Sequence, residues 1–282
     1  MRLLLLMVTN VAVIAVAFLA VTLTGLPASV GGVLGVCLAL GMGGAFLSLL
    51  TSKWAIRRAT RAKIVKPGDS HGGDWLLVNV RDLAEIFDVA MPKVAVYPSL
   101  SMNAFATGPS RDRALIGVSV GLLHSMNEPE ARAVLAHEMS HIANGDMVTL
   151  TLIQGVANGI GLFLSRLLLI VLGRPLRRRW NPFDIIHWVL FAAFQILFGF
   201  LSSLITMWFS RWREYKADAG AAEVVGPASM AAALHRLQYD RHPVVMPESV
   251  AALCIASPRF RWLRSLVSSH PPLDKRIARL QG

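Results

Sequence analysis

The N-terminal part of the chain is dominated by two long apolar stretches, residues 3–23 and 30–50. Neither contains Asp, Glu, Lys or Arg. At a rise of about 1.5 Å per residue, each is long enough to cross the hydrocarbon core of a bilayer as a helix. The first stretch is longer than the apolar part of a typical signal peptide, and a second apolar stretch follows it at once. We therefore predict that residues 1–50 form an uncleaved transmembrane hairpin.

Two later apolar stretches, residues 147–172 and 185–209, are predicted to be further membrane helices. They flank residues 173–184, which contain four arginines. If both helices cross the bilayer, these arginines lie on the outer side, against the usual positive-inside bias. The alternative is a hairpin that stays on the cytoplasmic side. Residues 147–209 are accordingly predicted as a separate hydrophobic domain.

The two remaining segments, residues 51–146 and 210–282, are polar enough to form a soluble domain. Residues 74–89 show the apolar periodicity of a helix, and the chain after Pro227 also has a helical pattern. Three short alternating or β-branched runs follow residue 92 and predict a small mixed sheet, with strands at 93–97, 103–107 and 114–119. The predicted fold class is α+β, mainly α, in a polytopic membrane protein.

The composition excludes several other classes of protein. The chain has 282 residues, of which 54% are hydrophobic and 16% are charged, and its mean hydropathy of +0.53 favours a membrane protein. Two cysteines cannot form a disulfide framework. The net charge of +11 lies largely in clusters beside apolar stretches, so a nucleic-acid partner is not predicted. The cluster that follows residue 50 indicates that both ends of the hairpin face the cytoplasm.

The strongest chemical motif is His137-Glu138-Met139-Ser140-His141. It lies in a predicted helix that Asn127 can cap and that Gly145 can end. Residues one turn apart share a helical face, so both imidazoles can reach a single Zn²⁺ while Glu138 lies beside the open coordination position. This pattern is the zinc-hydrolase signature.

A catalytic zinc normally has a third protein ligand, for which Glu214 is the best candidate. Asp218, one turn along the same predicted helix, can accept a hydrogen bond from the outer nitrogen of His137 or His141. These residues can share one ion only if they lie on the same side of the membrane. The two apolar stretches between His141 and Glu214 must therefore cross the membrane twice in total, or not at all.

Together these motifs resemble the HtpX-type membrane zinc metalloproteases, which are related to the CAAX prenyl proteases. The resemblance implies a zincin-like (gluzincin) catalytic domain and one Zn²⁺ per chain, held by His137, His141 and Glu214. It also implies that Glu138 is the catalytic base and that the site faces the cytoplasm of a bacterial inner membrane. The segments that carry the resemblance are 103–108, 134–141, 144–146, 213–219 and 270–276.

For each of the remaining candidate site residues, the sequence allows a functional and a structural interpretation. His270 or Arg276 could stabilise the tetrahedral oxyanion if the C-terminal motif returns to the cleft. A structural cap and a salt-bridge partner are the competing interpretations. The strand at Asn103, Ala104 and Phe105 resembles one that such proteases use to bind an extended substrate by β-augmentation. An ordinary sheet strand is the alternative.

We therefore predict a zinc endopeptidase in the lipid bilayer that cleaves misfolded or damaged membrane proteins in quality control, with Glu138 moving the proton from water to the leaving amine. The quality-control role comes from the resemblance alone. One alternative is a protease of narrow specificity for a single substrate. Another is a non-catalytic, zinc-stabilised membrane scaffold. The sequence does not indicate an oligomeric state.

Overall fold

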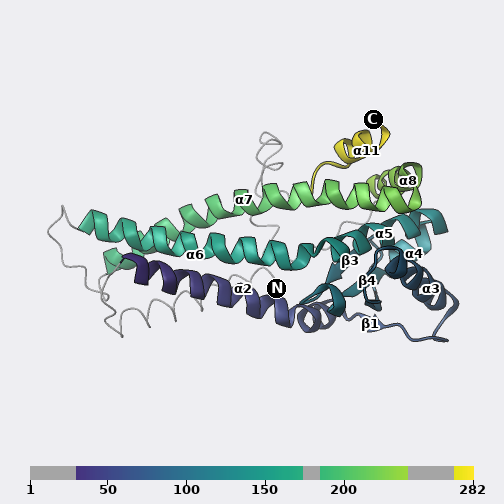
Figure 1. The fold of residues 1–282 in the computed structure, drawn as a ribbon, viewed down its shortest axis with the longest axis horizontal. Helices are drawn as coiled ribbons and strands as arrows, with labels where there is room; N and C mark the ends of the chain where they lie inside the picture. The colour runs from purple at the N-terminus through teal and green to yellow at the C-terminus, as the bar shows by residue number, and fades with distance from the viewer. Residues whose placement is uncertain (1–29, 174–184, 241–269) are drawn as a thin grey trace. The chain divides into compact units, whose positions relative to one another are not determined.

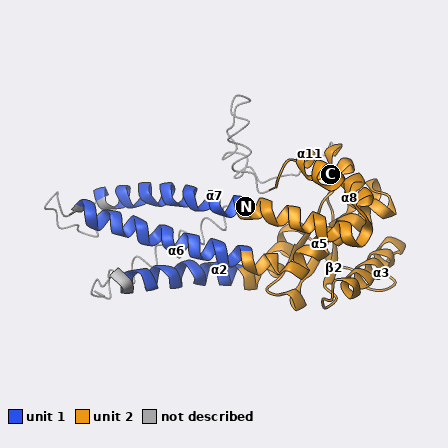
Figure 2. Cartoon of the chain, turned by 45° about the horizontal axis from the view of Figure 1, so that its top comes forward, with its two compact units in different colours: residues 1–48, 150–208 blue, residues 49–149, 209–282 orange. Residues whose placement is uncertain are grey.

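The computed structural model of the protein describes residues 30–173, 185–240 and 270–282 (Figure 1). The predicted first membrane helix, residues 3–23, and the arginine-rich connection lie outside the described residues. The chain divides into two compact units (Figure 2). Unit 1 comprises residues 1–48 and 150–208, and unit 2 comprises residues 49–149 and 209–282.

Three long apolar helices, α2, α6 and α7, supply the described part of unit 1. Each contains a segment long and apolar enough to cross a membrane. The helices α2 and α7 continue well past the predicted apolar stretches, because the residues that follow, rich in Ala, Arg, Glu and Lys, are good helix formers. Their bounds are α2 Val30–Thr60, α6 Asp146–Gly173 and α7 Ile185–Val225.

Within unit 1, α2 and α6 cross at glycines. A Cβ atom built on Gly41 would lie 2.5 Å from the backbone N of Gly159 and 2.6 Å from the carbonyl O of Gly155. No side chain fits at that distance, so the two backbones are in direct contact. Small residues that let backbones approach are a common means of helix association in membranes.

Unit 2 contains a four-stranded mixed sheet with the order β1-β2-β4-β3. Strand β4 lies in the interior and is buried along its whole length. It pairs parallel with β2 and antiparallel with β3, while β1 pairs antiparallel with β2. The predicted mixed sheet is confirmed, although β1 was missed because two residues show no alternation. The strands are β1 Lys63–Ile64, β2 Lys93–Tyr97, β3 Ala104–Thr107 and β4 Leu115–Ser119.

Helices pack against this sheet to form the hydrophobic core of unit 2. Its largest fully buried side chains include Leu76, Leu83, Leu135 and Met139. The predicted helix at 74–89 begins earlier, because the Ser70 side chain caps it by accepting a hydrogen bond from the N–H of Gly73. The helices of unit 2 are α3 His71–Ile86, α4 Val120–Ser125, α5 Glu128–Asn144, α8 Pro227–Gln238 and α11 Leu273–Gln281.

Candidate metal centre

Helix α5 begins and ends at residues that fix its position. The side chain of Asn127 accepts a hydrogen bond from the N–H of Glu130 at 2.9 Å, and the Glu130 carboxylate accepts one from the N–H of Asn127 at 3.1 Å. This is the predicted capping box. At the other end, Gly145 adopts the left-handed conformation, with φ at 68°. The helix therefore presents both His137 and His141 in fixed positions on one buried face.

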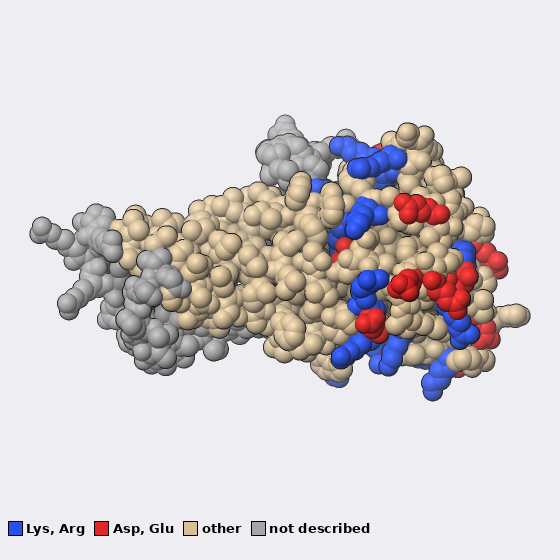
Figure 3. Space-filling view, viewed as in Figure 1, with Lys and Arg blue, Asp and Glu red and all other residues tan. Residues whose placement is uncertain are grey.

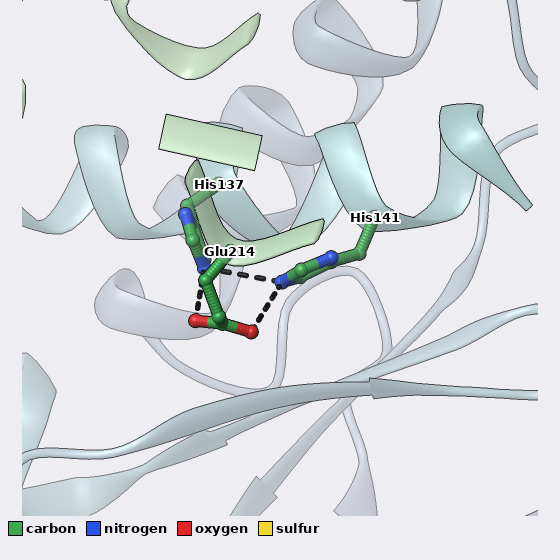
Figure 4. A group of neighbouring side chains, drawn as sticks. All are labelled: His137, His141 and Glu214. Carbon is green, nitrogen blue, oxygen red and sulfur yellow. Dashed lines mark hydrogen bonds and ion pairs between the residues drawn. The ribbon is translucent and has the colours of Figure 1, made fainter. Parts of the chain in front are cut away.

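Helix α7 brings a carboxylate onto that face. A Cβ atom on Gly220 would lie 2.5 Å from the Ser140 hydroxyl oxygen, so α7 approaches α5 more closely than a side chain at position 220 would allow. Glu214, on the same helix, is only 1% exposed. Its Oε1 lies 3.3 Å from Nε2 of His141, and its Oε2 lies 3.6 Å from Nε2 of His137 (Figure 4).

Two further carboxylates hold the outer nitrogens of the imidazoles. Nδ1 of His137 lies 3.0 Å from Oδ1 of Asp218, and Nδ1 of His141 lies 2.6 Å from Oδ2 of Asp146. Because a carboxylate only accepts hydrogen bonds, Nδ1 of His141 carries the proton. At His137, the ion-pair contact with Asp218 and the Arg276 N–H donor 3.5 Å from Nε2 favour the same tautomer. Asp218 was predicted to contact one of the two histidines, and the structure places it at His137.

Asp146 was not predicted as a partner of His141. It lies beyond the end of α5, at the first residue of α6. The left-handed turn at Gly145 redirects the chain. The rule that residues one turn apart lie on the same face of a helix therefore does not apply to Asp146. The signal that could have found it was an Asp directly after a helix-ending glycine, close in sequence to a zinc-motif histidine.

The arrangement of these atoms fits a divalent cation. With the protons on both Nδ1 atoms, the two Nε2 lone pairs face each other at 3.2 Å. Both oxygens of Glu214 are buried, and the groups around them include imidazole nitrogens of His137, His141 and His270 and the guanidinium of Arg276. Two facing lone pairs beside a buried carboxylate repel one another unless a positive charge lies between them. The candidate ligand atoms all lie within 4.8 Å of one another.

The raised pKa values of both imidazoles also indicate that these surroundings favour a positive charge. Burial lowers the pKa of His141, but hydrogen bonds to Asp146 and Glu214 outweigh burial and raise it to about 9. The pKa of His137 is also raised, because its contacts with Asp218 and Glu214 outweigh burial. Without a metal, protons would therefore neutralise the site, and a metal ion must displace them.

The C-terminal motif returns to the site, as the prediction for His270 and Arg276 requires. Arg276 is 6% exposed and donates two hydrogen bonds to Asp218, at 2.8 Å from Nε and 2.6 Å from Nη2. Its Nη1 lies 3.4 Å from Oε2 of Glu214. Although burial opposes the charge of Arg276, the contact with Asp218 raises its pKa. Nδ1 of His270 lies 2.9 Å from the same Oε2, and its side chain is 61% exposed.

A cavity of about 140 Å³ opens beside these residues. Its walls include Asn103 and Ala104 as well as Glu138. Phe105 is not among the lining residues. Successive side chains of a strand point to opposite faces, and Phe105 packs over Gly117, with its ring 5.5 Å from that of Tyr97.

The comparisons with known proteins match this architecture. The model of the family described as Peptidase family M48 matches residues 72–282. Protease HtpX of Pasteurella multocida (strain Pm70) is 45% identical, over 100% of this chain and 98% of that protein. Protease HtpX of Escherichia coli (strain K12 / DH10B) is 44% identical, with the same coverage of both chains. The predicted resemblance is therefore confirmed.

A solved structure supports the fold class. The crystal structure of S. mikatae Ste24p aligns with a TM-score of 0.64 at 19% identity, covering 95% of this chain and 62% of that one. At this identity the likeness concerns the fold. It agrees with the mainly helical architecture, the small mixed sheet and the apolar helices of a membrane protein. With a family match over most of its length and a possible metal site, the chain belongs to peptidase family M48 and is a metalloprotease.

Proposed function

We propose that the protein is a zinc-dependent endopeptidase whose single Zn²⁺ is held by His137, His141 and Glu214. The observation that carries this proposal is the convergence of two Nε2 lone pairs on the buried carboxylate of Glu214. Two imidazoles and one carboxylate are a ligand set that zinc takes in hydrolases. When bound, Zn²⁺ supplies Lewis acidity that lowers the pKa of water to about 7 and polarises a peptide carbonyl.

Glu138 is the proposed general base. It lines the cavity beside His137 and Glu214, and no described residue forms an ion pair with it. Its carboxylate is therefore available to take a proton from the attacking water and to deliver that proton to the leaving amine. A structural zinc site would instead close its fourth position with a protein ligand. Among the described residues, the ligand group contains only three members.

Arg276 and His270 receive different roles in this proposal. Arg276 is a positioning residue, because its guanidinium holds both oxygens of Asp218, and Asp218 in turn holds His137. His270 is exposed, lines the cavity and lies beside Glu214. It is therefore placed to donate a hydrogen bond to the oxyanion that develops on the scissile carbonyl.

The substrates we propose are unfolded or damaged membrane proteins. Strand β3 lies at the edge of the sheet, and Asn103 and Ala104, at its start, line the cavity. An extended segment that pairs with this edge would be bound through its backbone, which suits many sequences. A protease with one narrow substrate remains the second candidate, because a cavity of about 140 Å³ accepts few side chains at a time.

The proposed location is the bacterial inner membrane, with the site facing the cytoplasm. On the face drawn in Figure 3, charged side chains gather over the elements of unit 2. Lys53, Arg57 and Arg58 follow the uncharged part of α2 directly. Basic residues after a membrane helix favour the cytoplasmic side.

The test is cleavage of an unfolded model protein by the full-length, detergent-purified and zinc-loaded enzyme. We expect cleavage by the wild type and loss of at least about a hundredfold in rate for Glu138→Gln, because general bases contribute at this order. Zinc content measured in both proteins shows that the variant has lost the base and not the metal. Absence of cleavage by both, with zinc bound, would favour narrow specificity or a scaffold.

A further inference from the structure

A second, open pocket of about 460 Å³ lies where the C-terminal part of α2 meets the sheet of unit 2. Four cationic side chains line it, together with apolar atoms of Trp54 and Leu115. Its lining shares no residue with the cavity beside the metal centre. The four cationic residues are Lys53, Arg57, Arg58 and Lys93.

These four charges have no anionic partner among the described residues. No carboxylate lines the pocket, and none of the four cations forms an ion pair within the described part of the chain. Some other arginines of unit 2 do have such partners: Arg132 pairs with Asp82, and Arg236 with Glu130 at 3.4 Å. Like charges gathered around one space repel each other, so an anion bound between them would lower the energy of the group.

Contacts with neighbouring groups hold two of the side chains in place. The ammonium of Lys53 donates hydrogen bonds to the carbonyl oxygens of Arg113, at 2.9 Å, and Ala114, at 3.4 Å. The guanidinium of Arg58 lies 5.7 Å from the centre of the Trp54 ring, a cation–π distance. The pocket is therefore built from positioned groups and is not a random cluster of mobile lysines.

The position of the pocket along α2 suggests the source of the anion. Lys53 follows the uncharged residues 30–50 within one helical turn. In a transmembrane helix, that turn reaches the level of the lipid headgroups. Trp54 is 65% exposed, and an exposed Trp next to Lys and Arg is typical of the membrane interface.

We propose that this pocket binds the phosphate of an anionic phospholipid headgroup. Arg57 and Arg58 offer the forked N–H donors that match phosphate oxygens, and the two lysines add compact charges. The Trp54 ring provides an apolar wall for the glycerol and upper acyl groups of the lipid. A free phosphate ion would use the cations but not this wall. The inference does not depend on the proposed substrate or on the metal.

The experiment measures lipid retention by the full-length protein in the Glu138→Gln background, which prevents self-cleavage. The protein is equilibrated with equal amounts of phosphatidylglycerol and phosphatidylcholine, and bound lipids are quantified by native mass spectrometry. We expect the starting protein to retain phosphatidylglycerol preferentially. In the double variant Arg57→Gln/Lys93→Gln this preference should fall by about tenfold. The reason is that each basic side chain near an anionic lipid surface contributes substantially to the free energy of binding.

The matched control is Lys66→Gln/Arg81→Gln, which removes two exposed cations that do not line the pocket. It should keep the preference for phosphatidylglycerol. An equal loss in both double variants would show an effect of net charge alone and would overturn the proposal. If the pocket double variant does not fold, the single changes Arg58→Gln and Lys93→Gln must each lower retention relative to Arg81→Gln.

Inorganic phosphate separates the two sources of the anion. We expect 5 mM phosphate to leave bound phosphatidylglycerol in place, because only the lipid also contacts Trp54. Trp54→Ala should then weaken retention while the four cations remain. Full displacement of the lipid by phosphate, or unchanged retention by Trp54→Ala, would overturn the assignment to a lipid headgroup.

Discussion

At the scale of single residues, the proton on each imidazole Nδ1 determines what the metal centre can do. Asp218 and Asp146 hold these protons at His137 and His141, so both Nε2 atoms are left as electron-pair donors. Neither carboxylate has to touch the metal for this effect. The selection of the tautomer therefore depends on residues outside the zinc-hydrolase motif.

Replacing Asp146 with Asn should weaken zinc binding by about ten- to a hundredfold, the usual effect of removing an outer partner of a ligand histidine. An amide can present its N–H₂ group to Nδ1, and it carries no charge to stabilise the imidazole–metal pair. Competition with a chromogenic chelator measures the affinity. Glu223→Gln, an exposed change on α7, is the control. Equal affinities for the two variants would contradict the role of Asp146.

Replacing Glu214 with Gln should reduce bound zinc much more than replacing Glu138 with Gln. Glu214 supplies the proposed third ligand atom, whereas Glu138 only lines the cavity. Metal content per chain after dialysis, measured by plasma emission spectroscopy, distinguishes the two variants. Full occupancy in both would remove Glu214 from the ligand set.

The metal-free protein should lose stability as the pH rises from about 7 through 9. The pKa of His141 rises from an unfolded value of about 6.5 to about 9 in the folded protein, so the folded state holds the extra proton. This stabilisation is complete below pH 6.5 and disappears above pH 9. Melting temperatures of chelated Glu138→Gln at pH 6.5 and 9.5 measure the loss. The added change Asp146→Asn should reduce the difference.

At the scale of secondary structure, the elements with local end signals were the ones the sequence could define. Helix α5 was predicted with both ends, because Asn127, Glu130 and Gly145 act within a few residues of the chain. The contact of Arg276 with Asp218 joins residues far apart in sequence, and no periodicity or spacing reveals it. The three ligand candidates could be chosen by residue type and spacing. Asp218 could be named as an outer partner as well, but its assignment to His137 and the pairing of Asp146 with His141 required the fold.

The crossing of α2 and α6 should be the most sensitive point of unit 1. Gly41→Leu would place a side chain where backbone atoms of Gly155 and Gly159 already lie, and overpacking of this kind costs about 1–3 kcal/mol or more. Gly43→Leu is the control, because no atom lies within 4 Å of a Cβ there. Thermal unfolding in detergent compares them. Equal melting temperatures would show that the crossing is not tightly packed.

At the scale of the whole molecule, the path of the chain through the membrane is constrained by the metal centre. His141 precedes α6 and Glu214 lies near the end of α7, yet their side chains meet. The chain between them must therefore return to the side from which it left. Two membrane crossings, one by α6 and one by α7, satisfy this condition. A path in which neither helix crosses satisfies it as well.

Cysteine labelling at Asn181 decides between these topologies. We expect a cysteine placed there, in a chain with Cys37 and Cys254 replaced by Ser, to react with a membrane-impermeant maleimide from the periplasmic side, because α6 and α7 are both long and apolar enough to cross. A cysteine at the exposed Lys66 position should react only from the cytoplasmic side. Labelling of both positions from the same side would defeat the four-span topology.

The turn at Gly145 has a mechanical consequence. One residue separates α5, which ends soon after His141, from α6, which begins at the Asp146 that holds this histidine. Glu214 likewise lies on α7, a continuous helix that also contains a membrane-spanning length. At both places the described backbone carries metal-site residues and an apolar membrane-helix length within one helix or two adjoining helices. We therefore expect a change of bilayer thickness that tilts these helices to act on the residues proposed to hold the metal.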